Sequence, residues 1–168
     1  MMFSYSPNPD FAPSKNTDKW PTVCLGNQSY KVSPIPWAPI AIGDAAEAAA
    51  LYGGQLPSKE LVEAIYVRAD VVISPATQTH DGTPKTMSSE KMYKKVSQDI
   101  WTKINVCVFD LENTLIVGTH KDIILTSNGE LALYGWKMLN NENIQNVFSG
   151  HSHDWCDYSQ GVRIVIPI

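Results

Sequence analysis

Residues 115–137, LIVGTHKDIILTSNGELALYGWK, decide the fold, because short apolar runs alternate there with residues that form turns. The triplet Ser127-Asn128-Gly129 separates two such runs and is a strong signal for a β-hairpin. The last third of the chain is therefore predicted to form a mainly antiparallel sheet. The predicted strands cover residues 106–111, 115–117, 123–126, 131–136 and 162–166.

Upstream of this region the apolar residues follow helical spacing. Gly53-Gly54 is a C-terminal signal for one helix, and Ser58 is placed to cap the next. Leu61, Val62 and Ile65 would give that second helix a buried face. Helices early and strands late predict one α+β domain, with about three helices packed on a sheet. The predicted helices cover residues 42–52, 58–69 and 89–103.

The segments outside these elements are predicted from their turn-forming and polar residues. Residues 1–19, rich in Pro, Ser, Asn and Asp, are predicted to be a flexible arm that leads into a domain over residues 20–168. Gly26-Asn27-Gln28 predicts a hairpin between residues 20–25 and 30–33. Residues 75–89 are predicted to be a mobile loop.

Composition limits the classes of function. The chain has 168 residues, 13 Lys+Arg against 17 Asp+Glu, and 43% hydrophobic residues. That hydrophobic content excludes a disordered chain, and the acidic balance argues against general nucleic-acid binding or membrane-surface binding. We expect neither a secretory signal in residues 1–18 nor a membrane-spanning stretch in residues 37–52, because both are too polar.

The cysteines indicate the compartment. Cys24, Cys107 and Cys156 are odd in number and form no CxxC pair, which is typical of thiols in a reducing compartment. We therefore expect a cytoplasmic protein. Cys24 and Cys107 fall in predicted strands, where they are expected to be inert core residues.

Residues 150–163, GHSHDWCDYSQGVR, contain the densest group of reactive side chains. One interpretation is a metal site formed by His151 and His153 with Cys156 or Asp157. A second is general acid–base chemistry, in which an aspartate orients a histidine beside hydroxyl and cationic groups. A third is structural, with each polar group satisfied within the fold. The second is preferred, without metal or cofactor, and its predicted catalytic residues are His151, Lys121, Tyr158 and Asp157.

The second candidate stretch is residues 117–122, VGTHKD, at the mouth of a predicted strand pair. Its lysine would bind a phosphate or carboxylate, or would lie in a solvated turn. We expect this stretch and the one around residue 155 to line a shared hollow, occupied by a small anionic ligand or substrate. The residues predicted to bind it are Arg163, Ser159, His120, Trp136, Tyr134 and Lys59.

Four motifs resemble those of an uncharacterised family of small bacterial proteins. The family pattern is L-P-T, then G-x-x-K-D, then Y-G-W, then H-x5-D-Y-S-H-G-x-R. The resemblance covers roughly residues 50–166 and implies a common fold and a site, without a reaction. The second histidine of the last motif is Gln160 here, so acid–base chemistry at that position is lost. The matching residues are Leu56-Pro57-Ser58, Gly118 with Lys121-Asp122, Tyr134-Gly135-Trp136, and His151 with residues 157–163.

Three functions fit these residues. The first is a metal-independent hydrolase or lyase that cleaves a phosphodiester such as a cyclic nucleotide signal, an activity that suits a virus-encoded protein acting in its host's cytoplasm. The second is a cell-wall (peptidoglycan) hydrolase, favoured by family members that look exported. The third is a module that sequesters a small anionic ligand without chemistry, with a pocket formed in a homo-oligomer.

Overall fold

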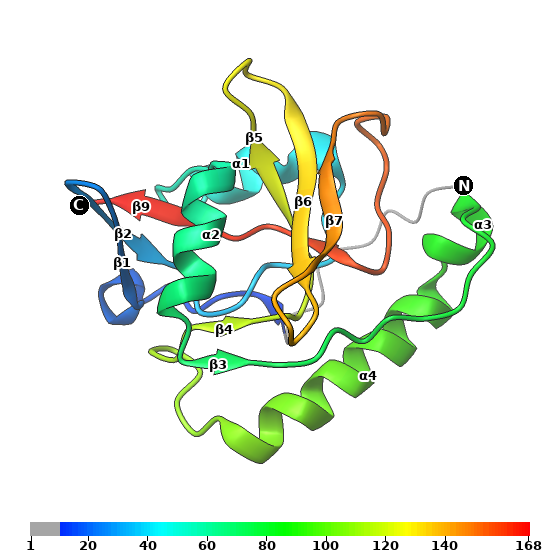
Figure 1. Cartoon of the computed structure of the whole chain (residues 1–168), viewed down its shortest axis with the longest axis horizontal. Helices are drawn as coiled ribbons and strands as arrows, with labels where there is room; N and C mark the ends of the chain where they lie inside the picture. The colour runs from blue at the N-terminus through cyan, green and yellow to red at the C-terminus, as the bar shows by residue number, and fades with distance from the viewer. Residues whose placement is uncertain (1–10) are drawn as a thin grey trace.

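The fold is α+β, as predicted, and the computed structural model describes residues 11–168 (Figure 1). Within that part of the chain the strands form three sheets, ordered β1-β2-β9, β3-β4 and β7-β6-β5-β8. The strands are β1 (Thr22–Leu25), β2 (Gln28–Val32), β3 (Val71–Val72), β4 (Ile116–Val117), β5 (Lys121–Leu125), β6 (Leu131–Lys137), β7 (Asn143–Phe148), β8 (Gln160–Gly161) and β9 (Val165–Pro167).

The four-stranded sheet is built around the predicted hairpin. β5 and β6 pair antiparallel with Ile123 opposite Leu133, and Gly129 occupies the turn with a φ of 79°. Thr126 N donates to Glu130 O at 2.8 Å and closes the turn. The prediction of a hairpin at residues 127–129 is confirmed. The outer strand β8 runs parallel to β5, a pairing that the sequence pattern does not reveal.

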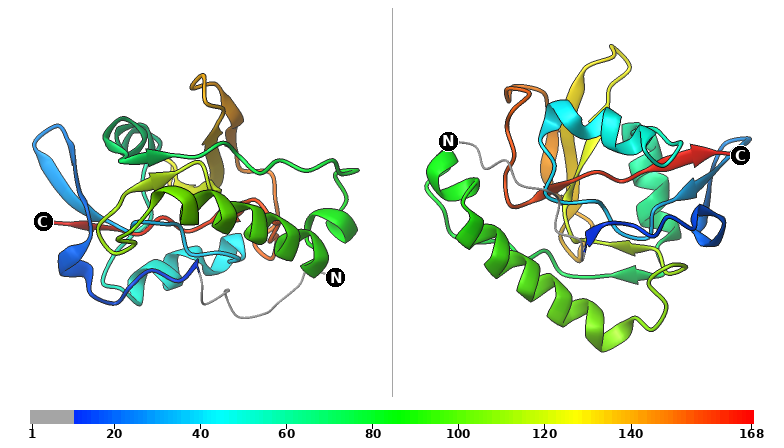
Figure 2. Two further views of the ribbon diagram at one scale, coloured as in Figure 1. Left: turned by 90° about the horizontal axis from the view of Figure 1, so that it is seen from below. Right: turned by 180° about the vertical axis from the view of Figure 1, so that it is seen from behind.

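Helices cover both faces of this sheet, with α1 behind it and α2 in front (Figures 1 and 2). Ser58 caps α2 as predicted, its hydroxyl accepting from Leu61 N at 3.1 Å. Val62 of α2 packs on the four-stranded sheet, whereas Ile65 packs on the three-stranded sheet, so α2 joins the two. The helical segments are η2 (Thr17–Lys19), η3 (Ile42–Asp44), α1 (Ala45–Ala50), α2 (Lys59–Arg68), α3 (Pro84–Met87) and α4 (Glu90–Cys107).

The largest hydrophobic cluster fills the space between the other face of the sheet, α1 and α4. Ile123 and Leu133 enter it from the sheet, Ala49 from α1, and Val96 and Ile100 from α4. α4 is also tied to the segment after β3, because Lys103 Nζ donates to the carbonyl oxygen of Ser74 at 2.8 Å.

The predicted strand at residues 106–111 is wrong, because α4 continues to Cys107 and the chain then forms a mostly exposed loop. Its apolar side chains do not enter the core: Phe109 is 100% exposed. Cys24 and Cys107 are exposed rather than buried. The structure also contains strands β3 and β7, which the sequence did not predict, and two short helices in segments predicted to be irregular: η2 in the arm and α3 in the loop at 75–89.

The boundary between arm and domain also moves. Phe11 is fully buried in the main cluster and stacks on Trp101 with ring centroids 5.1 Å apart. Residues 11–19 therefore belong to the folded domain, since burying a phenylalanine side chain contributes about 2 kcal/mol. The rest of the predicted arm, residues 1–10, lies outside the described residues.

Candidate functional site

Strand pairing brings the two candidate stretches together. β8 lies beside β5 with Gln160 opposite Lys121, and Lys121 N donates to Ser159 O at 2.6 Å. The loop over residues 149–159 therefore ends against the start of β5. Lys121 and the acidic loop residue Asp157 become neighbours although they are 36 positions apart.

Asp157 is the buried centre of this arrangement. Its carboxylate accepts the indole N–H of Trp155 at 3.0 Å. It also accepts the backbone N–H and the hydroxyl of Ser159, at 2.7 and 2.6 Å. The Lys121 ammonium lies 3.8 Å from the same carboxylate. A buried carboxylate needs this many partners, because an ion left without them in the interior is costly.

The imidazole ring of His151 stacks on the indole ring of Trp155. The two rings are stacked with centroids 4.2 Å apart and 3° between their planes. Burial lowers the pKa of His151 below 6.5, and the charge of Lys121 lowers it further, against an opposing effect of Asp157. The imidazole is therefore mostly neutral at pH 7, which is the form that accepts a proton.

Lys121 is the cation of the site. Its side chain is 10% exposed. Its ammonium lies 3.8 Å from the Asp157 carboxylate, which is beyond hydrogen-bond distance. Within residues 11–168, Asp157 is the acidic group that pairs with it. The N–H groups of Lys121 thus remain available to an anion. Together, His151 and Lys121 combine a proton acceptor with a positive charge, held in one set of contacts through Trp155 and Asp157.

Two further predicted residues lie close to this set but are already engaged. The hydroxyl of Ser159 is bound to Asp157. The hydroxyl of Tyr158 accepts from Gln78 N at 3.4 Å, and burial raises its pKa. Tyr158 therefore binds the backbone at Gln78. Its hydroxyl has this partner instead of the predicted partner His151.

Arg163 has a structural role, contrary to the prediction that it binds substrate. Its guanidinium is buried and donates to the carbonyl oxygens of Ser33, Pro34 and Ile116 at 2.7–2.9 Å. Asp122 lies 3.9 Å from it, and burial raises the pKa of that carboxyl to about 6. Arg163 thus joins β4 to the segment after β2 from inside the protein.

His120 is also an interior residue rather than a substrate-binding one. It is 2% exposed and meets the ring of Phe11 edge-on at 5.2 Å. Neither ring nitrogen has a hydrogen-bond partner within residues 11–168. Burial lowers the pKa of His120 to about 3, with Arg163 adding to the effect, so the ring stays neutral.

The predicted aromatic pair is split by a β-bulge. Gly135 has a φ of 89° and Trp136 one of 58°, and the register of β6 with β7 shifts at this point. Trp136 turns into the core, where its indole N–H donates to Gly118 O at 2.9 Å. Tyr134 turns to the opposite face of the sheet, where it packs against Val62 of α2.

Lys59 lies with Tyr134 on that opposite face. Its ammonium lies 5.5 Å from the centre of the Tyr134 ring. The hydroxyl of Tyr134 donates to Glu63, which also pairs with Lys137 at 2.9 Å. Because Lys121 alternates with Asp122 along β5, and Asp122 pairs with Tyr134, Lys121 faces the other side of the sheet. Lys59 and Tyr134 therefore do not contribute to the His151–Lys121 site.

Trp155 is the member of the site that the sequence analysis missed. A signal existed: a tryptophan four residues after a histidine, in a loop dense in polar groups, has both a face to stack and an N–H to donate. The metal alternative gains no ligand set. Burial raises the pKa of the Cys156 thiol to about 12, and residues 11–168 contain no group of three His, Cys, Asp or Glu arranged to hold an ion.

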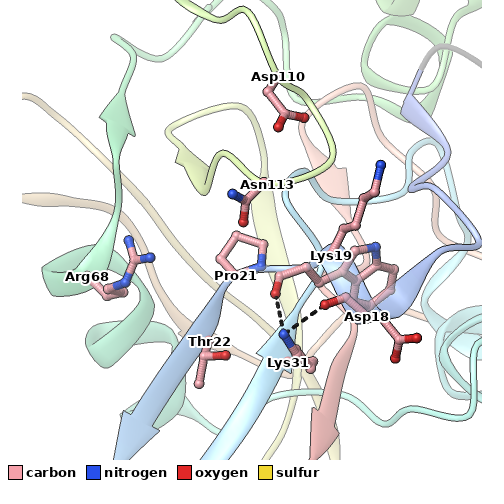
Figure 3. Close-up of a pocket in the computed structure, with 9 residues that line it drawn as sticks. Asp18, Lys19, Pro21, Thr22, Lys31, Arg68, Asp110 and Asn113 are labelled. Atoms are coloured by element: carbon pink, nitrogen blue, oxygen red, sulfur yellow. Dashed lines mark hydrogen bonds between the residues drawn. The ribbon is translucent and has the colours of Figure 1, made fainter.

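The structure also contains a hollow of about 520 Å³ on another part of the surface (Figure 3). It has none of the predicted site residues. Its cations are occupied: Lys31 Nζ donates to the carbonyl oxygens of Asp18 and Trp20 at 3.0 Å, Lys19 pairs with Glu112, and Arg68 pairs with Asp70. The predicted hollow shared by residues around 120 and 155 is therefore not this one.

Comparison of the chain with protein-family models, with curated proteins and with solved structures gives no significant match. No helix within residues 11–168 is both long and apolar enough to cross a bilayer. Function is therefore inferred from the chemistry of His151, Lys121 and the residues that hold them.

Proposed function

We propose that the protein is a hydrolase or lyase that cleaves a phosphodiester, with His151 as general base and Lys121 as the cation that binds the phosphate. The observation that carries the proposal is the connected set His151–Trp155–Asp157–Lys121. It connects a neutral imidazole with an ammonium whose side chain is 10% exposed. A phosphodiester is an anion, and a general base and a positive charge both accelerate its cleavage.

The proposed reaction uses the protein's own side chains. The imidazole of His151 takes the proton of the attacking oxygen, which belongs to water in a hydrolase or to a substrate hydroxyl in a lyase. That oxygen bonds to phosphorus, the bond from phosphorus to the leaving oxygen breaks, and the imidazolium returns the proton to the leaving oxygen. Lys121 neutralises the charge that builds up on the phosphoryl oxygens.

Asp157 and Trp155 are positioning residues in this proposal. Asp157 is buried and fixes Trp155 through the indole N–H, and Trp155 fixes the plane of the His151 ring. The proposed setting is the cytoplasm, with a small anionic substrate such as a cyclic nucleotide. We also propose that the protein is encoded by a virus and removes a signal of its host, and that it assembles into a homo-oligomer.

The second candidate is a module that binds the anion without cleaving it. One observation favours it: the hydroxyls of Tyr158 and Ser159 are bound elsewhere, which leaves His151 and Lys121 as the reactive groups among the predicted residues. A cell-wall hydrolase, the remaining alternative, is not favoured by any contact in the site.

The test is incubation with a panel of cyclic di- and trinucleotides, followed by chromatography. The wild type should convert a panel member to its linear form, in the presence or absence of EDTA. His151→Gln should abolish conversion, whereas His153→Gln, at an exposed residue two positions away, should not. Recovery of intact ligand from the denatured complex would support the binding module instead. If wild type and His151→Gln convert the substrate equally, the proposed mechanism is wrong.

A further inference from the structure

Phe148, at the end of β7, presents an aromatic ring beside the proposed base. Its ring meets His151 edge-on with centroids 4.9 Å apart. The space for this ring depends on Gly150, because a Cβ atom at residue 150 would lie 2.6 Å from the tip of the Phe148 ring. The Phe148 side chain is thus held in the row of rings formed with His151 and Trp155.

The strand register places Phe148 on the same side of the sheet as Lys121. Phe148 pairs with Leu133, and Leu133 pairs with Ile123. Directly paired residues share a face of a sheet, and Lys121 shares that face with Ile123 because alternate residues point to the same side. A ligand anchored at Lys121 would therefore lie on the same face of the sheet as Phe148, whose ring contacts His151.

Phe148 is 44% exposed, whereas Trp155 is buried. An exposed phenyl ring next to a charged site offers apolar area to a flat group, and stacking of a base on an aromatic side chain contributes about 1–3 kcal/mol. Flexible acyl chains have no flat face and do not gain this stacking energy. The ligand that uses both features carries a phosphate and a planar ring.

We propose that the substrate is a nucleotide, with its phosphate at Lys121 and its base stacked on Phe148. This inference rests on the proposed function, since it assigns the substrate class of the same site. Phe148 is then a residue that determines specificity, not a catalytic residue.

The test compares two matched probes, AMP and ribose 5-phosphate, which share the sugar and the phosphate and differ in the base. Binding is measured by calorimetry. The wild type should bind AMP about tenfold more tightly than ribose 5-phosphate. Phe148→Leu, which keeps an apolar side chain but removes the ring face, should bring the ratio close to one, and Phe148→Tyr should restore it. Phe109→Leu, at an exposed phenylalanine outside the site, is the control and should leave the ratio unchanged.

The outcomes separate the inference from the proposed function. An AMP preference that depends on Phe148, without turnover of any cyclic nucleotide, would support the substrate class and contradict the enzyme. Turnover with equal binding of the two probes would support the enzyme and overturn the role of Phe148. Failure of the wild type to bind either probe would overturn the inference, as would an AMP preference that survives Phe148→Leu.

Discussion

The imidazole of His151 lies parallel to the indole of Trp155, with ring centroids 4.2 Å apart. The indole is fixed in turn, because its N–H is bonded to the buried carboxylate of Asp157. A histidine stacked in this way loses part of its hydration and keeps one orientation. Loss of hydration favours the neutral imidazole, which is the form that the proposed general base requires.

The pH dependence of turnover should follow His151. Its pKa is lowered below 6.5, chiefly by burial, and the base must be neutral to accept a proton. We therefore expect kcat/KM to be flat at pH 7 and to fall on acidification, with a midpoint below 6.5. Rates measured between pH 4 and 8 provide the check. A midpoint above 7 would show that another group is the base.

Replacing Asp157 should destabilise the protein. Asp157→Ala leaves the Trp155 indole N–H and the Ser159 backbone N–H without their acceptor in a buried site. The expected loss in the free energy of unfolding is about 3 kcal/mol. Asp154→Ala is the matched control in the same loop, and at this exposed residue we expect a change within about 0.5 kcal/mol. Equal effects of the two changes in urea unfolding would contradict the central position of Asp157.

His120 should make stability depend on pH. Its folded pKa is lowered to about 3, whereas the unfolded value is near 6.5, so the unfolded chain binds the proton first. The free energy of unfolding is therefore unaffected by this titration above pH 6.5. It decreases by about 1.4 kcal/mol per pH unit as the pH falls from 6.5 toward 3. The difference in unfolding free energy between the wild type and His120→Leu should show this slope. Parallel stability curves for the two proteins would mean that His120 is not buried as a neutral ring.

Gly118 should tolerate no side chain. A Cβ atom there would lie 2.1 Å from the carbonyl oxygen of Ile73, and the φ of 95° disfavours other residues. Gly118→Ala should cost about 3 kcal/mol or more. Gly129→Ala is the control, because its φ of 79° is similar but nothing lies within 4 Å, so only about 1 kcal/mol of backbone strain is expected. Similar melting temperatures for the two variants would disprove the close approach at Gly118.

The sequence predicted those elements whose defining contacts lie between residues close together in the chain. The turn at Ser127-Asn128-Gly129 and the cap at Ser58 lie within a few residues of the contacts they make, so both were recognisable. The strand expected at 106–111 failed for the opposite reason. Its apolar residues favour a strand, but they lie on the exposed end of α4 and the loop that follows. Strand β7 was missed because mostly exposed residues give no alternation between apolar and polar.

The site was predictable only in part. The density of polar groups at 150–163 made His151 and Asp157 candidates, but the sequence could not separate candidate substrate-binding side chains from those that stabilise the fold. Arg163 bonds to carbonyl oxygens about 130 positions earlier in the chain, a distance over which sequence pattern carries no information. Tyr134 and Trp136, two residues apart, point to opposite faces because Gly135 and Trp136 form a bulge.

The most direct test of the account is an NMR titration of His151 in the wild type and in Lys121→Met. If the two residues form one site, removal of the Lys121 charge raises the pKa of His151, because that charge helps to lower it. Addition of inorganic phosphate should raise the same pKa in the wild type and have little effect in Lys121→Met. An identical titration of His151 in both proteins, with and without phosphate, would contradict the claim that these residues act on the same ligand.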